Sequence, residues 1–209
     1  MKALSFPLVR HMAAAALVGA ALAGCATAPA PESSQRELVV AITASHELIT
    51  FHAGQPDRIL ERRPVTGLPT GERLVGIDFR VARGVLYALS QAGRLYTLDI
   101  PTGALRPVGP APAVLGLRGT AFGFDFNPAA DRIRVVSNTG QNLRLHPDTG
   151  AAVDGDPAVE GVQPDPALRY AWSDTHAGRN PDIAGAAYTY NAQDSKITTN
   201  YAIDRTLGV

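Results

Sequence analysis

A repeat of fixed period constrains this 209-residue chain more than any other feature. Residues 76–104 return without a gap 47 residues later, and ten of the 29 aligned positions are identical. The shared positions include Gly76, Asp78, Phe79, Gly93 and Gly103, which return as Gly123, Asp125, Phe126, Gly140 and Gly150. Such a period is typical of stacked supersecondary units. We therefore expect the same structural unit to be built at least twice.

Short runs rich in β-branched and aromatic residues fill the repeats and are bounded by turn residues. They predict strands at residues 38–43, 47–52, 58–63, 74–79, 85–90, 94–99, 104–108, 120–126, 132–137, 142–146, 183–190 and 198–204. Gly93 and Gly140 are expected to supply positive φ at equivalent hairpin turns. A weaker copy lies 47 residues upstream, and a fourth begins near Ile183, where residues 200–204 imitate 95–99.

These patterns predict an all-β, propeller-like array of four-stranded antiparallel units. A 47-residue unit holds about four strands, at roughly 12 residues for each strand and turn. Phe79 and Phe126 are expected to be buried in the stacked sheets. Roughly three and a half units fall short of the four to eight blades of a closed propeller. We therefore expect an incomplete or open ring and a chain that is truncated at its C-terminus.

The N-terminus has the pattern of a lipoprotein signal peptide over residues 1–24. Lys2 and Arg10 precede an apolar run over 13–23 that is too short to span a bilayer. Small residues then lead directly to Cys25, the only cysteine of the chain. This arrangement resembles the bacterial lipobox, in which the cysteine is acylated. A plain secretory signal with an incidental cysteine is the alternative.

Residues 25–36 are predicted to be a flexible tether, and residues 37–209 the β-repeat domain. Ala26 follows the cysteine where an aspartate would resemble an inner-membrane retention signal. We therefore expect a lipid-anchored protein of the bacterial cell envelope, at the outer membrane and facing the periplasm. From Cys25 onward the chain carries 17 basic and 19 acidic side chains, so nucleic-acid binding has no electrostatic support.

Several segments resemble the bacterial "domain of unknown function 4394" family. They are residues 123–128 (GFDFNP), 131–137 (DRIRVVS), 140–145 (GQNLRL), 148–150 (DTG) and 186–189 (AAYT). The resemblance runs from about residue 37 to the C-terminus. It implies an exported, propeller-type repeat protein, and it brings no established activity or catalytic residue with it. The lipobox and a long insertion at 153–182 depart from the family pattern.

The insertion contains the residues that we predict to bind a partner. They are Arg169, Tyr170, Trp172, Asp174, His176 and Arg179. Loops laid over a rigid β scaffold often carry binding residues, and aromatic and arginine side chains suit a protein or glycan partner. In the alternative, Tyr170 and Trp172 close the end of the domain and the polar residues are merely solvated.

An oxygen-rich group gives a weaker indication of a metal site, at Asp125, Asn127 and Asp131. In the sister unit the last two become Arg80 and Gly84, which favours a role in turns. The aspartate itself occurs in both copies. We expect its carboxylate to accept backbone N–H groups from the adjacent hairpin.

The sequence favours a non-enzymatic binding or scaffold domain that needs no cofactor. It contains no Gly-x-Ser-x-Gly elbow, no histidine pair with zinc spacing and no phosphate-binding glycine loop before a helix. One alternative is a metal-dependent, lactonase-like propeller hydrolase with its metal near Asp125, Asn127 and Asp174. Another is a non-functional fragment of a longer propeller protein.

Overall fold

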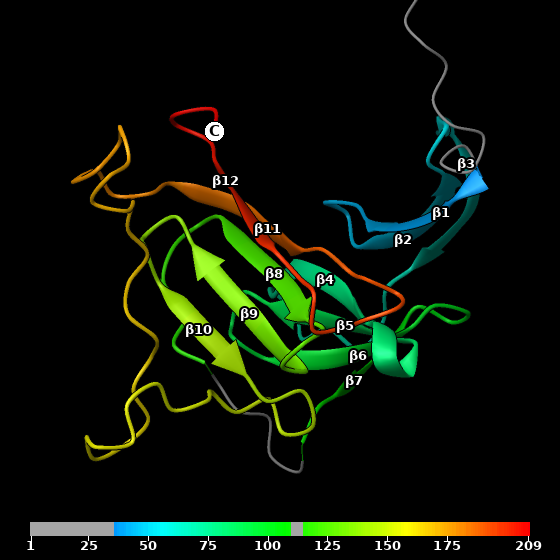
Figure 1. Ribbon diagram of the computed structural model, residues 1–209. Helices are drawn as coiled ribbons and strands as arrows, with labels where there is room; N and C mark the ends of the chain where they lie inside the picture. The colour runs from blue at the N-terminus through cyan, green and yellow to red at the C-terminus, as the bar shows by residue number, and fades with distance from the viewer. Residues whose placement is uncertain (1–35, 110–114) are drawn as a thin grey trace, which may run out of the picture.

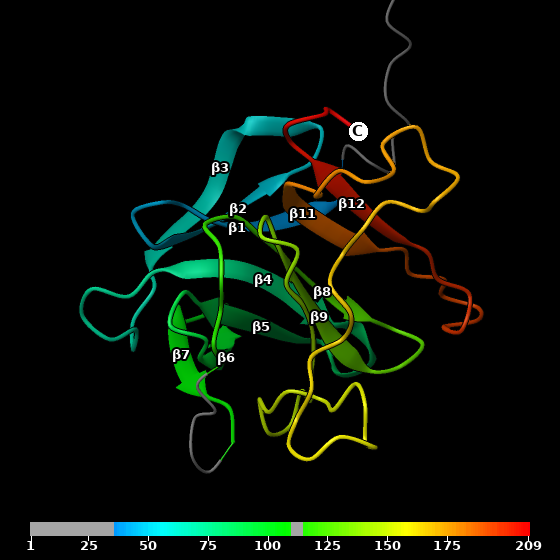
Figure 2. The same cartoon turned by 90° about the vertical axis from the view of Figure 1, so that its left-hand side faces the viewer.

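The chain is built from short antiparallel strands, as Figure 1 and Figure 2 show. The computed structural model describes residues 36–109 and 115–209. The predicted signal peptide, the lipidation residue Cys25 and nearly all of the predicted tether lie outside these residues. Within them, no helix combines the length and the apolar character that a membrane span requires. The all-β prediction is confirmed.

The strands, in chain order, are β1 (Leu38–Ile42), β2 (Glu47–His52), β3 (Gln55–Pro64), β4 (Leu74–Arg80), β5 (Val85–Ser90), β6 (Leu95–Asp99), β7 (Ala104–Pro107), β8 (Phe122–Asn127), β9 (Arg132–Ser137), β10 (Asn142–Leu145), β11 (Ile183–Tyr188) and β12 (Asn200–Asp204). A 3-10 turn, η1 (Val81–Arg83), joins β4 to β5. The sheets have the orders β1-β2-β3, β4-β5-β6-β7, β10-β9-β8 and β11-β12. We name them units A, B, C and D. Every predicted strand is present.

Units B and C have the same register, displaced by the period of the repeat. The pair Leu86↔Leu98 in unit B becomes Ile133↔Leu145 in unit C. Unit B has four strands, as predicted. In unit C the fourth strand is reduced to a single bridge at Ala152, opposite Leu145. The prediction of four strands in each unit is therefore wrong for unit C, because the chain leaves the sheet after this bridge and begins the insertion.

The hairpin turns after β5 and β9 are equivalent, as predicted. Gly93 has a φ of 78° and Gly140 a φ of 77°, in the left-handed region that favours glycine. Their amides donate to the carbonyl oxygens of Ser90 and Ser137 at 2.9 and 3.0 Å. The same tight turn is therefore built twice.

Unit A is the predicted weaker copy, and unit D departs from the prediction. The pair Ala41↔Ile49 of β1 and β2 lies 47 residues before Ala88↔Tyr96 of β5 and β6. Strand β12 was expected to correspond to β6, but it pairs directly with β11, as β5 pairs with β4. Local alternation of apolar residues could not predict which strand β12 pairs with, because alternation specifies the buried face of a strand and not the neighbouring strand in the sheet.

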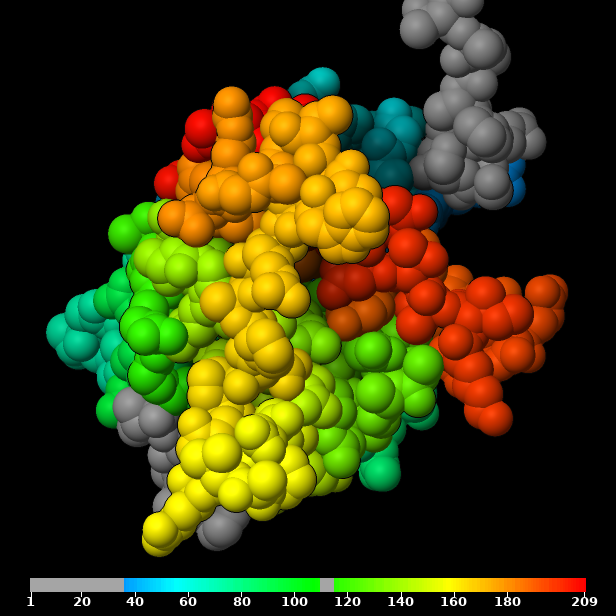
Figure 3. Space-filling model, turned by 60° about the vertical axis from the view of Figure 1, so that its left-hand side comes forward, coloured from blue at the N-terminus to red at the C-terminus, as the bar shows by residue number. Residues whose placement is uncertain are grey.

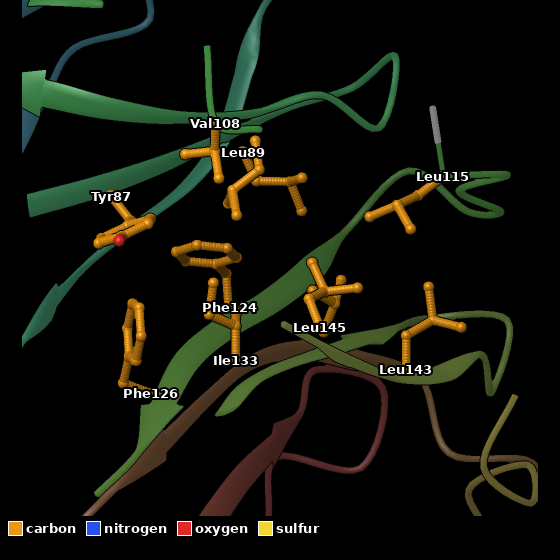
Figure 4. Packing of buried hydrophobic residues seen from close by; sticks show 11 residues of the cluster. Tyr87, Leu89, Val108, Leu115, Phe124, Phe126, Ile133, Leu143 and Leu145 are labelled. Atoms are coloured by element: carbon orange, nitrogen blue, oxygen red, sulfur yellow. The ribbon is translucent and has the colours of Figure 1, made fainter. Parts of the chain in front are cut away.

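Unit B is buried on both faces, and this divides the hydrophobic core in two. Tyr87 and Leu89 of β5 face unit C, whereas Leu86 and Ala88 face unit A. This is the period of two that a strand imposes. The core between units B and C, shown in Figure 4, consists of Tyr87, Leu89, Leu95, Val108, Leu115, Phe124, Phe126, Ile133, Val135, Leu143 and Leu145.

The two equivalent phenylalanines are buried to different extents. Phe126 is 6% exposed, and its ring lies edge-on to Tyr87 with the centroids 5.1 Å apart. Phe79 is only partly buried. The position equivalent to Tyr87 in unit A is Val40, which is smaller and fills less of the space beside Phe79. The predicted burial is confirmed for Phe126 and holds only in part for Phe79.

Candidate functional site

The insertion at 153–182 lies along the surface of units C and D, where Figure 3 shows it in yellow and orange. Asp165 fixes it to unit C. Its Oδ2 lies 2.6 Å from Nη1 of Arg134 on β9, and its Oδ1 lies 2.7 Å from Nη2 of Arg144 on β10. The backbone is held as well, because the amide of Leu168 donates to the carbonyl of Gly140 at 2.9 Å.

The carboxylate of Asp165 is ionised in this environment. Burial acts to raise its pKa, but the hydrogen bonds from Arg144 and Arg134 outweigh burial and hold the pKa below its usual value. Asp165 of the insertion is therefore the counter-ion of Arg134 and Arg144, in a cleft of about 530 Å³ between units C and D.

Tyr170 anchors the next part of the insertion to unit D. Its hydroxyl donates to Oδ2 of Asp204 at 2.6 Å. This bond, with further backbone N–H donors, lowers the pKa of Asp204 to about 2, and it raises the pKa of Tyr170 to about 12. The ring of Tyr170 also packs against His176, with the centroids 5.3 Å apart. Tyr170 thus holds the insertion against unit D.

Trp172 does not close the domain. Its side chain is 93% exposed. It precedes a compact turn in which Oδ1 of Asp174 accepts the amide of His176 at 2.7 Å and the amide of Arg179 donates to the carbonyl of His176 at 3.0 Å. Of the predicted binding residues, the structure brings Tyr170 and His176 together. It leaves Arg169, Trp172, Asp174 and Arg179 exposed.

A second set of predicted residues joins the first strands of neighbouring units, β4, β8 and β11, which we call the inner strands. Oδ2 of Asp78 accepts the amide of Phe126 at 2.7 Å, and Oδ2 of Asp125 accepts the amide of Tyr188 at 2.6 Å. The carboxylates do accept backbone N–H groups. The donors, however, lie on the next unit and not on the adjacent hairpin, because stacking places β4 beside β8 and β8 beside β11.

Glycine is required at the same junctions. A Cβ on Gly76 would collide with the side chain of Phe124, and one on Gly123 would lie 2.5 Å from the backbone nitrogen of Ala186. The repeated pattern Gly–apolar–Asp–apolar is therefore a rule for packing one inner strand against the next.

The two aspartates line a cleft of about 370 Å³ with aromatic walls that include Phe79, Phe126 and Tyr188. Burial, together with the charge of Asp78, raises the pKa of Asp125 to about 7. Burial also raises the pKa of Asp78, although the amide of Phe126 acts against it. Neighbouring carboxyl groups with raised pKa values in a cleft can exchange protons near neutral pH.

The weak metal candidates already have partners. Oδ1 of Asn127 accepts the amides of Ala129 and Ala130 at 2.9 and 3.1 Å. Oδ1 of Asp131 accepts a hydrogen bond of 2.8 Å from Arg80, whose side chain is 4% exposed. Residues 36–109 and 115–209 contain no group of three or more histidine, cysteine, aspartate or glutamate residues arranged to hold a metal ion.

Asp131 and its counterpart Gly84 instead serve a turn. Their φ angles are 48° and 62°, both left-handed. This supports the interpretation of these positions as turn residues.

The sequence interpretation missed Asp165, Arg134 and Arg144. A signal was available for the arginines, because they replace Tyr87 and Thr97 of the sister unit. A repeat position that changes from an uncharged residue to arginine indicates that a different surface covers it. Asp165 gave no comparable signal, since it lies in the insertion and has no counterpart.

Comparisons with known proteins give distant structural likenesses and a family match. No curated protein matches the chain. Solved structures that resemble it include BamB from Moraxella catarrhalis, at 17% sequence identity and a TM-score of 0.36. That alignment covers 84% of this chain and 46% of the BamB chain, so this chain spans less than half of that protein. Residues 47–209 match the family described as a domain of unknown function, DUF4394. Because the match covers most of the sequence, the chain belongs to the DUF4394 family.

Proposed function

We propose that this chain is a non-enzymatic binding domain of the bacterial cell envelope, and that it contacts a protein or glycan through the insertion. One observation carries the proposal: Trp172 is 93% exposed between segments that are fixed to the domain. Large aromatic side chains are seldom left so fully in water, and tryptophan is prominent among the residues that dominate binding interfaces.

The attachment of the insertion supports this role. Asp165 holds it to unit C before Trp172, and Tyr170 holds it to unit D within two residues of the tryptophan. A binding loop that is held in place loses less conformational entropy when its partner arrives. Trp172 is therefore presented on a supported loop.

The neighbouring charges suit a polar or anionic partner. Arg169 and Arg179 are both exposed and flank the tryptophan in sequence. An indole ring stacks on the apolar face of a sugar or on a peptide side chain, while guanidinium groups bind hydroxyl or carboxylate groups. Peptidoglycan-type glycans and envelope proteins offer both kinds of surface.

The test is retention by defined envelope components. The domain without its lipid is passed over immobilised peptidoglycan and over envelope protein extract, beside the Trp172→Ala variant. We expect wild-type retention and loss of at least about tenfold in affinity on substitution, the scale of an interface hot spot. Tyr201→Ala, at a tyrosine that is 62% exposed on β12, is the matched control. Equal behaviour of all three proteins would rule out the Trp172 surface.

The finer architecture is part of the proposal. The side-by-side order of β4, β8 and β11 and the face-to-face packing of units A, B and C support a propeller-like array arranged as an incomplete ring. Unit A, which consists of β1–β3, packs on the face of unit B that lies opposite unit C (Figure 2). In this arrangement the Gly–apolar–Asp–apolar strands line the centre.

The lipid anchor at Cys25 supplies the envelope location in this proposal, with the protein at the outer membrane and facing the periplasm. Support comes from the lipobox-like sequence alone. Cys25→Ser should move the protein from the membrane fraction to the soluble fraction in cell fractionation. Persistence in the membrane fraction would contradict the anchor without affecting the binding surface.

A second candidate is hydrolytic chemistry in the cleft of Asp78 and Asp125. The observation in its favour is the pKa of Asp125, raised to about 7, which suits a general acid or base near neutral pH. A lactonase-like enzyme would add a divalent metal near Asp125, Asn127 and Asp174, and Asn127 would then have to give up the hydrogen bonds that its Oδ1 accepts from the amides of Ala129 and Ala130. Metal analysis of the purified protein separates the candidates: a stoichiometric calcium or zinc ion that raises the Tm favours the hydrolase.

A further inference from the structure

Within the part of the chain that the structure describes, unit A has no strand at one position where its register predicts one. The register of β1 and β2 is the register of β5 and β6, 47 residues earlier. Strand β5 pairs with β4 on one side and β6 on the other, whereas β1 pairs with β2 alone among the described residues. Among residues 36–109 and 115–209, no strand takes the position in unit A that corresponds to β4.

A groove lies at this position. It measures about 430 Å³ and is lined by Val40–Ile42 of β1, by the turn after β1, and by Arg73–Ile77 at the start of β4. Figure 2 shows β1 and β4 in the neighbouring sheets that form its two sides. A groove with a strand edge on one side and an inner strand on the other matches the surroundings of β4 between β5 and β8.

The edge of β1 presents hydrogen-bonding groups to the groove. The amide of Thr43 donates to the carbonyl of Glu47 on β2 at 2.9 Å. Because amide directions alternate along an antiparallel strand, the amides of Val40 and Ile42 point away from β2, toward the groove. Such an edge is a template for the addition of a strand.

We propose that this groove binds an extended segment of a partner polypeptide that carries the pattern Gly–apolar–Asp–apolar, and that the segment pairs with β1 as the inner strand of unit A. The pattern follows from the two junctions already described. In the equivalent register, the aspartate of the segment lies opposite Val40 and accepts the amide of Phe79, as Asp78 accepts the amide of Phe126. Its glycine lies opposite Ile42 and allows close approach to Ile77.

The partner has to supply the pattern. The residues of this chain at the equivalent sequence positions are Pro29 and Pro31, which lie outside the described residues. They replace the glycine and the aspartate, and proline has no amide hydrogen for a sheet ladder. A second copy is a poorer source, because its β4 and β8 are already paired within units B and C.

Fluorescence anisotropy with a labelled peptide tests the proposal. The peptide has the sequence of residues 121–128, AFGFDFNP, and the receptor is the protein from residue 25 onward with Cys25→Ser. We expect saturable binding. In the peptide, G123V should abolish binding because of the added side chain, and D125A should weaken it about tenfold through loss of the hydrogen bond from the backbone amide of Phe79.

Substitution of the groove gives the matched comparison. Val40→Pro removes one edge amide, at a position where an edge strand tolerates proline, and should abolish peptide binding. Val40→Thr keeps the amide and the branched shape and should bind as the wild type does. Trp172→Ala should also bind normally, which separates this groove from the surface proposed above.

A photo-crosslinking peptide keeps the test decisive if Val40→Pro does not fold. Crosslinks in residues 38–44 or 73–79 support the groove. Three results would overturn the proposal: no saturable binding, crosslinks confined to other segments, or a dimer in which a second copy already occupies the groove.

Discussion

The junction between units B and C and the junction between units C and D share one backbone design and have different contents. In both, an aspartate of one inner strand accepts an amide from the next, and a glycine permits close approach. Between B and C the sheet faces carry Tyr87 and Leu89, and the space is filled by apolar packing. Between C and D the equivalent positions are Arg134 and Val136, and the insertion enters.

The difference shows that stacking geometry and core composition are separable in this fold. Hydrogen bonds between the inner strands fix how neighbouring units stack, whether or not the rest of the junction is filled by apolar side chains. Side chains on the strands beside them, β5 in unit B and β9 in unit C, then decide whether the junction is closed by apolar packing or holds a polar segment. The closed junction provides stability, whereas the polar junction supports the exposed loop with Trp172.

The largest expected effect comes from the apolar junction. Phe126→Ala removes a ring that packs against Tyr87, and it should lower the free energy of unfolding by about 3–5 kcal/mol. Urea unfolding followed by circular dichroism measures the change. A loss below about 1 kcal/mol would mean that this junction is not the main core.

Asp165→Ala should have a smaller effect, at the polar junction. It leaves Arg134 and Arg144 without their counter-ion, but both are partly exposed, so the expected loss is about 1–2 kcal/mol at neutral pH. Limited proteolysis should also cut the insertion faster. If the insertion stays protected, other contacts hold it.

The stabilisation by Asp165 also has a predicted pH dependence. Its pKa in the folded state lies below the usual value, so its contribution is complete above about pH 4 and is lost as the pH falls through the folded value. The difference between wild type and Asp165→Ala should therefore shrink in acid. A constant difference from pH 7 to pH 2 would contradict the ion pairs.

Asp125→Asn tests the kind of hydrogen bond, from a backbone amide to an aspartate, that occurs at both junctions. The pKa of Asp125 is raised to about 7, so folding favours the protonated carboxyl. The stabilisation that the protonated carboxyl of Asp125 provides is complete below about pH 4 and is lost as the pH rises through 7. Asparagine retains an acceptor for Tyr188 without a charge, so the variant should gain about 1 kcal/mol at pH 8, discounted for partial exposure. Asp78→Asn is the matched control at the other junction, and unchanged pH profiles in both would refute the shared behaviour.

Trp172→Ala should change stability least. The side chain is 93% exposed, and the free energy of unfolding should stay within about 0.5 kcal/mol of the wild type. A larger loss in urea unfolding would mean that the tryptophan packs against the domain. In that case its value as a binding residue would fall.

Much of the fold could be predicted because its signals are local. Alternation and turn residues placed every strand, and the period predicted equivalent turns at Gly93 and Gly140. The contacts of the candidate site were less accessible. Tyr170 meets Asp204, and Asp165 meets Arg134, across long separations in sequence that no period relates. The partial exposure of Phe79 likewise depends on the smaller Val40 in the neighbouring unit.

The amino-acid sequence by itself determined which segments form strands, that units B and C are equivalent and which glycines lie at their turns. These features depend on backbone conformation and side-chain alternation within a few residues. Only the tertiary structure decided that Asp78 and Asp125 accept hydrogen bonds from the next unit and that β12 pairs with β11. It also decided that Arg134 and Arg144 form ion pairs with Asp165. These outcomes depend on which surfaces meet when the sheets stack, and several sequences of similar local pattern are compatible with different neighbours.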